Sequence, residues 1–198
     1  MSKIKIPILM YHSIELMPKS TIMRSLHVPT KRFKLQMSLL KLLGYRGLSL
    51  RDLKPYLDGK KKGKVVGITF DDGYKNNLLN ALPILIKNNF TATCYIVSKR
   101  IGYENTWDLD QGITQSQLMS DDEIHEWIAK GMDIGAHTQT HVNLQKVNLK
   151  VAKVEITKSK IDLEKSFNIK IVDFCYPYGK LTENVCSIVR DSGFDTAT

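Results

Sequence analysis

Two adjacent carboxylates follow an apolar run at residues 65–70 of this 198-residue chain, where Asp71 and Asp72 come directly after Phe70. A short continuous apolar run is typical of a buried parallel strand. In α/β folds the carboxyl ends of such strands open onto the active site. Because neighbouring carboxylates repel, each needs a cation, a proton or a hydrogen-bond donor to stay ionised. Taken alone, the pair is explained at least as well by a turn or a helix cap.

Two histidines, His137 and His141, follow a second short apolar run at residues 132–136. At this spacing both imidazoles fall on one face of a helical turn, close enough to bind one ion. A lone histidine is more often an ordinary core or surface residue, but this pair, with a carboxylate pair on another strand end, favours a metal site. Two neutral nitrogens and one carboxylate oxygen suit zinc and leave a coordination position for water.

The elements that must position these residues alternate between strands and helices. Strands are predicted at residues 6–11, 45–48, 65–70, 91–97, 132–136, 169–175 and 194–198, and helices at 30–43, 49–57, 77–88, 120–130, 147–167 and 181–192. This alternation is typical of βα units around a parallel sheet. Since eight units usually take about 250 residues, we expect a small or incomplete barrel. A single domain is expected over residues 1–198, and its end inside a predicted strand suggests that the natural protein continues.

The remaining segments carry weaker chemical signals. Residues 98–119 form a long irregular segment, and loops of this length are often functional. Its Trp107 is interpreted equally well as a substrate contact or as an anchor of the loop on the core. His27 and His125 have no chemical context and are expected at the surface. The helix predicted at 147–167 has among its apolar positions Val151, Val154, Ile161 and Leu163.

Three motifs occur in order along the chain, namely TFDDGY at residues 69–74, HTQTH at 137–141 and YPYG at 176–179. Together they resemble the successive motifs of the polysaccharide deacetylases, the NodB-homology or carbohydrate esterase family 4 domain. The resemblance extends over nearly the whole chain and is therefore far more specific than any single motif. It implies an α/β fold of the distorted (β/α)7–8 barrel type.

The resemblance also implies an activity, which is metal-dependent hydrolysis of the N-acetyl group of an N-acetylated sugar in a polysaccharide or oligosaccharide. It implies that Zn²⁺, with Co²⁺ or Fe²⁺ as alternatives, is held by Asp72, His137 and His141. Asp71 would be the general base, and the backbone N–H of Tyr178 would stabilise the oxyanion. Contacts to the glycan substrate would come from Tyr74, Tyr176, Pro177 and Trp107.

Two departures from the family pattern matter. Cys175 stands where family members commonly carry an arginine that pairs with the catalytic aspartate. Without that cation Asp71 is harder to keep ionised, and the sequence names no substitute. Cys175 as a nucleophile is a weak alternative, because nothing pairs it with a base. The second departure is the absence of the usual C-terminal Leu-x-His motif, which supplies the general acid.

The segment LMYH at residues 9–12 looks like that missing motif moved to the N-terminus. This arrangement resembles the circularly permuted deacetylases of the biofilm polymer poly-β-1,6-N-acetylglucosamine. A permutation is physically reasonable because the first and last strands of a barrel are neighbours. We therefore expect His12 to be the general acid rather than an inert strand-end histidine. A catalytically silent glycan-binding module on the same fold, or an esterase for O-acetyl groups, stays open as an alternative.

Composition adds few constraints. Lys and Arg outnumber Asp and Glu 29 to 20, which a solvated basic surface explains, although attraction to an anionic glycan or membrane surface is a sharper interpretation. No nucleic-acid-binding motif or basic-aromatic patch is present, so no nucleic-acid partner is expected. Cys94, Cys175 and Cys186 are odd in number and do not form a disulfide framework, so buried thiols are expected.

Residues 1–10 contain an apolar run that is too short for a secretion signal, and no stretch approaches the ~20 apolar residues of a membrane span. As written, the chain is expected to be cytoplasmic, whereas a trimmed N-terminus would make it a cell-envelope or secreted protein. The sequence gives no expectation about the oligomeric state.

Overall fold

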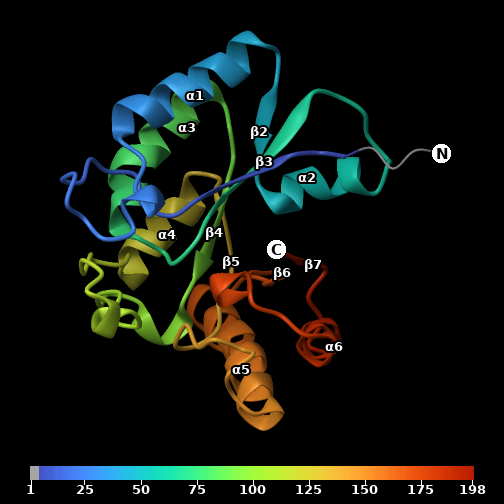
Figure 1. Cartoon of the computed structure of the whole chain (residues 1–198). Helices are drawn as coiled ribbons and strands as arrows, with labels where there is room; N and C mark the ends of the chain where they lie inside the picture. Colours follow the sequence, from blue (N-terminus) through green and yellow to red (C-terminus); the bar gives the residue numbers. More distant parts are fainter. Residues whose placement is uncertain (1–4) are drawn as a thin grey trace.

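A curled, wholly parallel β-sheet forms the centre of the computed structural model, which describes residues 5–198 (Figure 1). Its strands are β1 (Ile8–Tyr11), β2 (Arg46–Leu48), β3 (Val65–Phe70), β4 (Thr93–Ile96), β5 (Asp133–Ala136), β6 (Asp173–Phe174) and β7 (Thr196–Ala197). The α-helices are α1 (Thr30–Leu42), α2 (Leu50–Leu57), α3 (Leu82–Asn88), α4 (Asp121–Ala129), α5 (Leu149–Phe167) and α6 (Glu183–Asp191). The predicted α/β fold of βα units is confirmed.

The sheet is an incomplete barrel with two free ends. Its strand order is β1-β3-β4-β5-β6-β7, and β2 pairs with the first half of β3. Within residues 5–198 no pairing joins β1 to β7, so the curl does not close. Strand β1 pairs with β3 so that Tyr11 lies opposite Phe70. The N-terminal LMYH segment therefore ends beside the strand that carries the two carboxylates, which is the neighbour relationship that the permuted motif requires.

The two faces of the sheet have separate cores. Val66, Ile68 and Phe70 of β3 belong to the large core that includes buried residues of α1, α3, α4 and α5. Val65, on the other face, packs with Leu50 and Leu53 of α2, which lies across β3 from α1 and α3 (Figure 1). Because side chains alternate along a strand, Asp71 points to the same concave face as Val65. Helix α2 thus covers one end of the concave face and leaves the carboxyl ends of the strands open.

Two of the departures from the predicted bounds have local reasons. The strand predicted at 169–175 shortens to Asp173–Phe174, because the Ile171 N–H donates to the Glu164 carboxylate at 3.0 Å instead of joining the ladder. The helix predicted at 77–88 divides into a π-helical stretch, η2 (Asn77–Ala81), and α3, whose first turn contains Pro83. Such π-helical turns occur frequently at functional sites.

The face of helix α5 that packs on the core is not the one marked by the apolar residues named in the sequence analysis. Val151, Val154 and Ile161 are 40–50% exposed, and of the four apolar positions named above only Leu163 is buried. The buried face of α5 contains instead Ala152, Glu155, Ile156, Ser159, Leu163 and Phe167.

His125 is exposed, as expected, but the prediction that His27 is a surface residue is wrong. The His27 side chain is 5% exposed, and its Nδ1 lies 2.9 Å from Ser13 Oγ. None of the described helices has the length and apolar composition needed to cross a bilayer. Residues 1–4, part of the N-terminal stretch considered for a secretion signal, lie outside the described part of the chain.

Candidate active site

Strand register brings the predicted site residues to one edge of the sheet. His12 follows β1, and the Asp71 N–H next to it donates to the Tyr11 carbonyl at 2.9 Å. His137 follows β5, and the Cys175 N–H donates to the carbonyl of Ala136 at 2.9 Å. Groups that are far apart in sequence therefore lie side by side at the carboxyl ends of the strands, where α/β folds place their active sites.

Asp72, His137 and His141 form a triangle that could hold one metal ion. Asp72 Oδ1 lies 3.4 Å from His137 Nε2 and 3.2 Å from His141 Nε2. Ligand atoms about 2.0 Å from a tetrahedral ion stand about 3.3 Å apart, so the measured spacing fits such an ion. Asp72 Oδ1 is buried and receives no hydrogen bond within the described residues, as expected of an atom placed for a cation.

Burial lowers the pKa of His141 and so favours its neutral, ligating form. Burial also acts on His137, but Cys175 and Asp72 outweigh it and raise the pKa of His137, so an ion bound there would displace the proton on Nε2. His137 Nδ1 lies 2.9 Å from the backbone oxygen of Cys175, which accepts its proton and leaves Nε2 as the nitrogen that faces Asp72. Burial alone would raise the pKa of Asp72, but the adjacent His137 and His141 imidazoles outweigh burial and hold this pKa well below its usual range. The low pKa keeps Asp72 a carboxylate anion, the form that could bind a metal ion.

The loop that carries the histidines is strained and is supported by α5. Thr138 and His141 both have left-handed backbones, with φ of 63° and 64°, a conformation that costs about 1 kcal/mol or more per residue. Glu155 Oε2 accepts the N–H groups of Gln139 and Thr140, both at 2.9 Å, and Oε1 accepts the Thr140 hydroxyl at 2.8 Å. Glu155 is only 8% exposed. It belongs to the site, and the sequence did not single it out.

Asp71 lies beside this triangle in a buried pocket. It is 4% exposed, and burial raises its pKa, although the nearby His137 and His12 imidazoles oppose the rise. His12 Nε2 lies 3.8 Å from Asp71 Oδ2, and the Cys175 thiol donates to the same oxygen at 3.6 Å. These two groups are neighbours of Asp71 in a chain that lacks the usual arginine.

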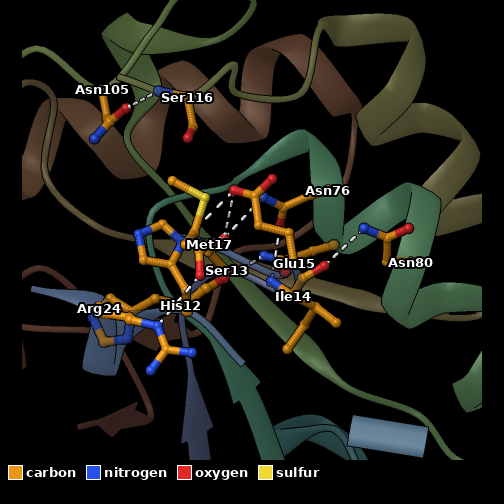
Figure 2. Close-up of polar contacts among 12 residues, drawn as sticks. His12, Ser13, Ile14, Glu15, Met17, Arg24, Asn76, Asn80, Asn105 and Ser116 are labelled. Atoms are coloured by element: carbon orange, nitrogen blue, oxygen red, sulfur yellow. Dashed lines mark hydrogen bonds and ion pairs between the residues drawn. The ribbon is translucent and has the colours of Figure 1, made fainter. Parts of the chain in front are cut away.

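Asparagines just before and within η2 fix the segment that begins with His12. Asn76 Oδ1 accepts the N–H of Ile14 at 2.9 Å, and Asn80 Nδ2 donates to the Ile14 carbonyl at 2.7 Å (Figure 2). Asn77, which is fully buried, donates to the carbonyl of His12 itself at 2.8 Å. Asparagine is a poor helix former, so Asn77 and Asn80 in the helix predicted at 77–88 were a signal that sequence reasoning missed.

Aromatic residues line the cavity above the triangle. This cavity has a volume of about 680 Å³. The Trp107 ring stacks on His141 with centroids 4.4 Å apart, and the Tyr178 ring meets His141 edge-on at 4.7 Å. Tyr178 also donates from its hydroxyl to Asp108 at 2.9 Å, which ties the 98–119 segment to the third motif. Trp107 thus both lines the cavity and holds its loop against the site.

The other predicted substrate contacts separate into two groups. Tyr74 and Tyr176 line the cavity, whereas Pro177 is buried and does not line it. Burial and the nearby charge of Asp72 raise the pKa of Tyr74 well above its usual range, so its hydroxyl stays protonated. The Tyr178 N–H, within residues 5–198, donates no hydrogen bond and is free to serve a ligand.

Comparisons with known proteins agree with this geometry. The model of the family described as "Polysaccharide deacetylase" matches residues 58–197. The putative polysaccharide deacetylase YxkH of Bacillus subtilis (strain 168) is 30% identical over 192 residues, covering 96% of this chain and 62% of that protein. The poly-beta-1,6-N-acetyl-D-glucosamine N-deacetylase of Staphylococcus aureus (strain MRSA252) is 30% identical over 179 residues, covering 84% of this chain and 58% of that protein.

A solved structure of a deacetylase has a similar fold. The Streptococcus pyogenes deacetylase PplD, in complex with acetate, superimposes with a TM-score of 0.82 and 26% identity, covering 98% of this chain and 82% of that one. The chain spans 58–62% of the length of the two curated relatives above. The family model covers well over half of the residues described here. This chain therefore belongs to the polysaccharide deacetylase family.

Proposed function

We propose that the chain is a metal-dependent N-deacetylase that removes the acetyl group from an N-acetylated sugar within a glycan, and that Zn²⁺ is its metal. The observation that carries this proposal is the convergence of a three-ligand triangle with a buried carboxylate and an imidazole at the base of one cavity. The similarity to the poly-beta-1,6-N-acetyl-D-glucosamine N-deacetylase of Staphylococcus aureus supports an N-acetylglucosamine polymer as the substrate class.

Asp72, His137 and His141 would hold the ion. A divalent ion bound there supplies a water of lowered pKa and polarises the acetyl carbonyl. Three protein ligands leave a position open to the cavity, which is the arrangement of catalytic rather than structural zinc sites. Glu155 keeps the strained loop of the two histidines in place from behind.

The chain's own groups would carry the protons and orient the substrate. Asp71 accepts a proton from the attacking water as the new C–O bond forms. The backbone N–H of Tyr178 donates to the carbonyl oxygen as negative charge develops on it. His12 then donates a proton to the sugar nitrogen as the C–N bond breaks, which releases acetate and a free amine.

The aromatic lining would bind the sugar. A cavity of about 680 Å³ is within the range of small-molecule sites and is large enough for a sugar residue. Trp107 and Tyr178 present ring surface around His141, and Tyr74 keeps a protonated hydroxyl near Asp72. Apolar faces combined with a few polar groups suit a pyranose ring, which has faces of both kinds.

The test is acetate release from a panel of N-acetylglucosamine oligomers by the zinc-loaded protein. We expect acetate from at least one N-acetylated oligomer, loss of the activity with a chelator, and loss in Asp71→Asn. Acetate released only from O-acetylated glycans would replace the N-deacetylase by an esterase. Glycan binding without acetate from any substrate would identify the silent binding module, in which Cys175 in place of arginine leaves Asp71 unable to act.

A further inference from the structure

A second set of three metal-ligating side chains lies beside the first. Asp71, His137 and Cys175 each offer one ligand atom, all within 4.8 Å of one another, and all three residues are buried. Cys175 Sγ lies 3.6 Å from Asp71 Oδ2. With a Zn–S distance near 2.3 Å and a Zn–O distance near 2.0 Å, the sulfur and oxygen ligands of a tetrahedral ion stand about 3.5 Å apart. The spacing is therefore already that of a metal site.

The surroundings of this second set also suit a cation. Asp71 Oδ1 is buried and has no hydrogen-bond partner within the described residues, so a carboxylate oxygen is left for an ion to satisfy. Cys175 lines the cavity, which gives an ion a path from solvent to the sulfur. Once an ion displaces the thiol proton, a carboxylate and a thiolate would place two negative charges here, and a thiolate ligand selects soft ions.

The two sets share His137. Because its Nδ1 is engaged by the Cys175 carbonyl, Nε2 is the nitrogen available to an ion in either set. One nitrogen lone pair binds one ion, so the two sets cannot be filled together. An ion in the second set would also occupy Asp71, the group proposed to accept the proton of the attacking water.

From this geometry we propose that Asp71, His137 and Cys175 form an alternative, inhibitory metal site for soft divalent ions, with Cd²⁺ as the probe. The ion displaces the thiol proton of Cys175 to solvent and is held by sulfur, imidazole nitrogen and carboxylate oxygen. The binding step stands independently of the activity, whereas the inhibition rests on the proposed function. Cys175, where related sequences commonly have arginine, is what creates the site.

The binding step is tested by titrating the metal-free protein with Cd²⁺ and recording the ultraviolet charge-transfer absorbance of a cadmium–thiolate bond. We expect the band in the unmodified protein and in Asp72→Asn, which lacks a ligand of the first set only. Cys186→Ser, a change of a thiol outside the cavity, is the matched control and should keep the band. Cys175→Ser should lose it. A band that persists in Cys175→Ser, or no band in the unmodified protein, would overturn the proposal.

The inhibition step is tested by adding Cd²⁺ to the zinc-loaded enzyme and expressing each rate relative to that variant's own uninhibited rate. Cys175→Ser should need on the order of tenfold more Cd²⁺ for half-inhibition, because the loss of even a supporting partner weakens metal sites by about that factor. Equal sensitivity of the two proteins would refute the inhibitory role. If no protein releases acetate, the proposed function fails, and the cadmium band still decides whether the second site exists.

Discussion

His12 Nε2 lies 3.8 Å from Asp71 Oδ2, at the ends of adjacent strands. The proposed acid and the proposed base therefore face each other, and each is placed by its own strand rather than by a flexible loop. This pairing gives the buried Asp71 carboxylate a neighbouring imidazole in the absence of arginine. The contributions of His12 and Asp71 to the proposed reaction can therefore be measured separately by substitution.

The pH dependence should report Asp71. Burial raises the pKa of this base above the ordinary value, and only its ionised form accepts a proton, so kcat/KM should fall as the pH falls through that raised pKa. Cys175→Ala removes the S–H donor that favours the ionised form and should move the acid limb to higher pH; Cys175→Ser keeps a donor and should move it less. The measurement is kcat/KM for acetate release across pH. An acid limb that is identical in the unmodified protein and Cys175→Ala would contradict this assignment.

Asn77 should affect turnover without affecting metal content. Asn77→Asp keeps the shape of the side chain but cannot donate to the His12 carbonyl, so the acid loses its position while the three ligands are untouched. We expect kcat to fall by about 10-fold or more, which is part of the 10²–10⁴ that general acid catalysis supplies, with KM and zinc content little changed. Asn88→Asp removes a comparable bond, to the Ile84 carbonyl in α3, and should leave kcat unchanged. Equal losses in the two variants would show a general effect on folding.

Glu155 should control metal affinity. Glu155→Gln replaces an acceptor oxygen by an NH₂ group that cannot accept from the loop N–H groups, so the histidine loop loses part of its support. Supporting partners of ligands are typically worth 10–100-fold in metal affinity, and we expect zinc to bind about 10-fold more weakly. Competition with a chromogenic chelator measures this directly. Glu164, on the same helix, accepts the N–H of Ile171 instead, so the Glu164→Gln variant should bind zinc with normal affinity. Weaker zinc binding in both variants would contradict the supporting role of Glu155.

Tyr178 is expected to act through its backbone. Tyr178→Phe removes the hydroxyl bond to Asp108 but keeps the ring against His141 and the backbone N–H. Removing an oxyanion donor costs about 10²–10³ in kcat, so retention of most of the activity in Tyr178→Phe is the result that fits a backbone role. A loss of about 100-fold in kcat would assign the catalytic donor to the hydroxyl instead. Steady-state kinetics on an N-acetylated oligomer distinguish the two.

The fold and the three candidate metal ligands could be predicted from the sequence, because a few physical rules determine where they lie. Parallel strands bring their carboxyl ends to one edge, so Asp72 after β3 and the histidines after β5 were expected at the same edge once the apolar runs were interpreted as strands. The start of α4 also follows a local rule, since Ser120 and Glu123 have the spacing of a capping box and the structure has both of its hydrogen bonds.

The residues that support the site could not be predicted from the sequence, because local sequence patterns predict the wrong environment for them. A charged residue in an amphipathic helix is expected in water, yet Glu155 faces inward on α5 since the histidine loop offers it three donors. Val151 and Val154 consequently turn outward, against their hydrophobicity. His27 was misplaced for a related reason, since its partner Ser13 belongs to a loop whose path the sequence does not reveal.

The most direct measurement is anomalous scattering at the zinc absorption edge from crystals of the protein loaded with one equivalent of Zn²⁺. We expect one strong peak bonded to Asp72, to Nε2 of His137 and to Nε2 of His141, with Asp71 and His12 next to its open position. A zinc ion bound elsewhere, or one that leaves any of the three ligands unused, would contradict the proposed metal centre and, with it, the deacetylase mechanism built on it.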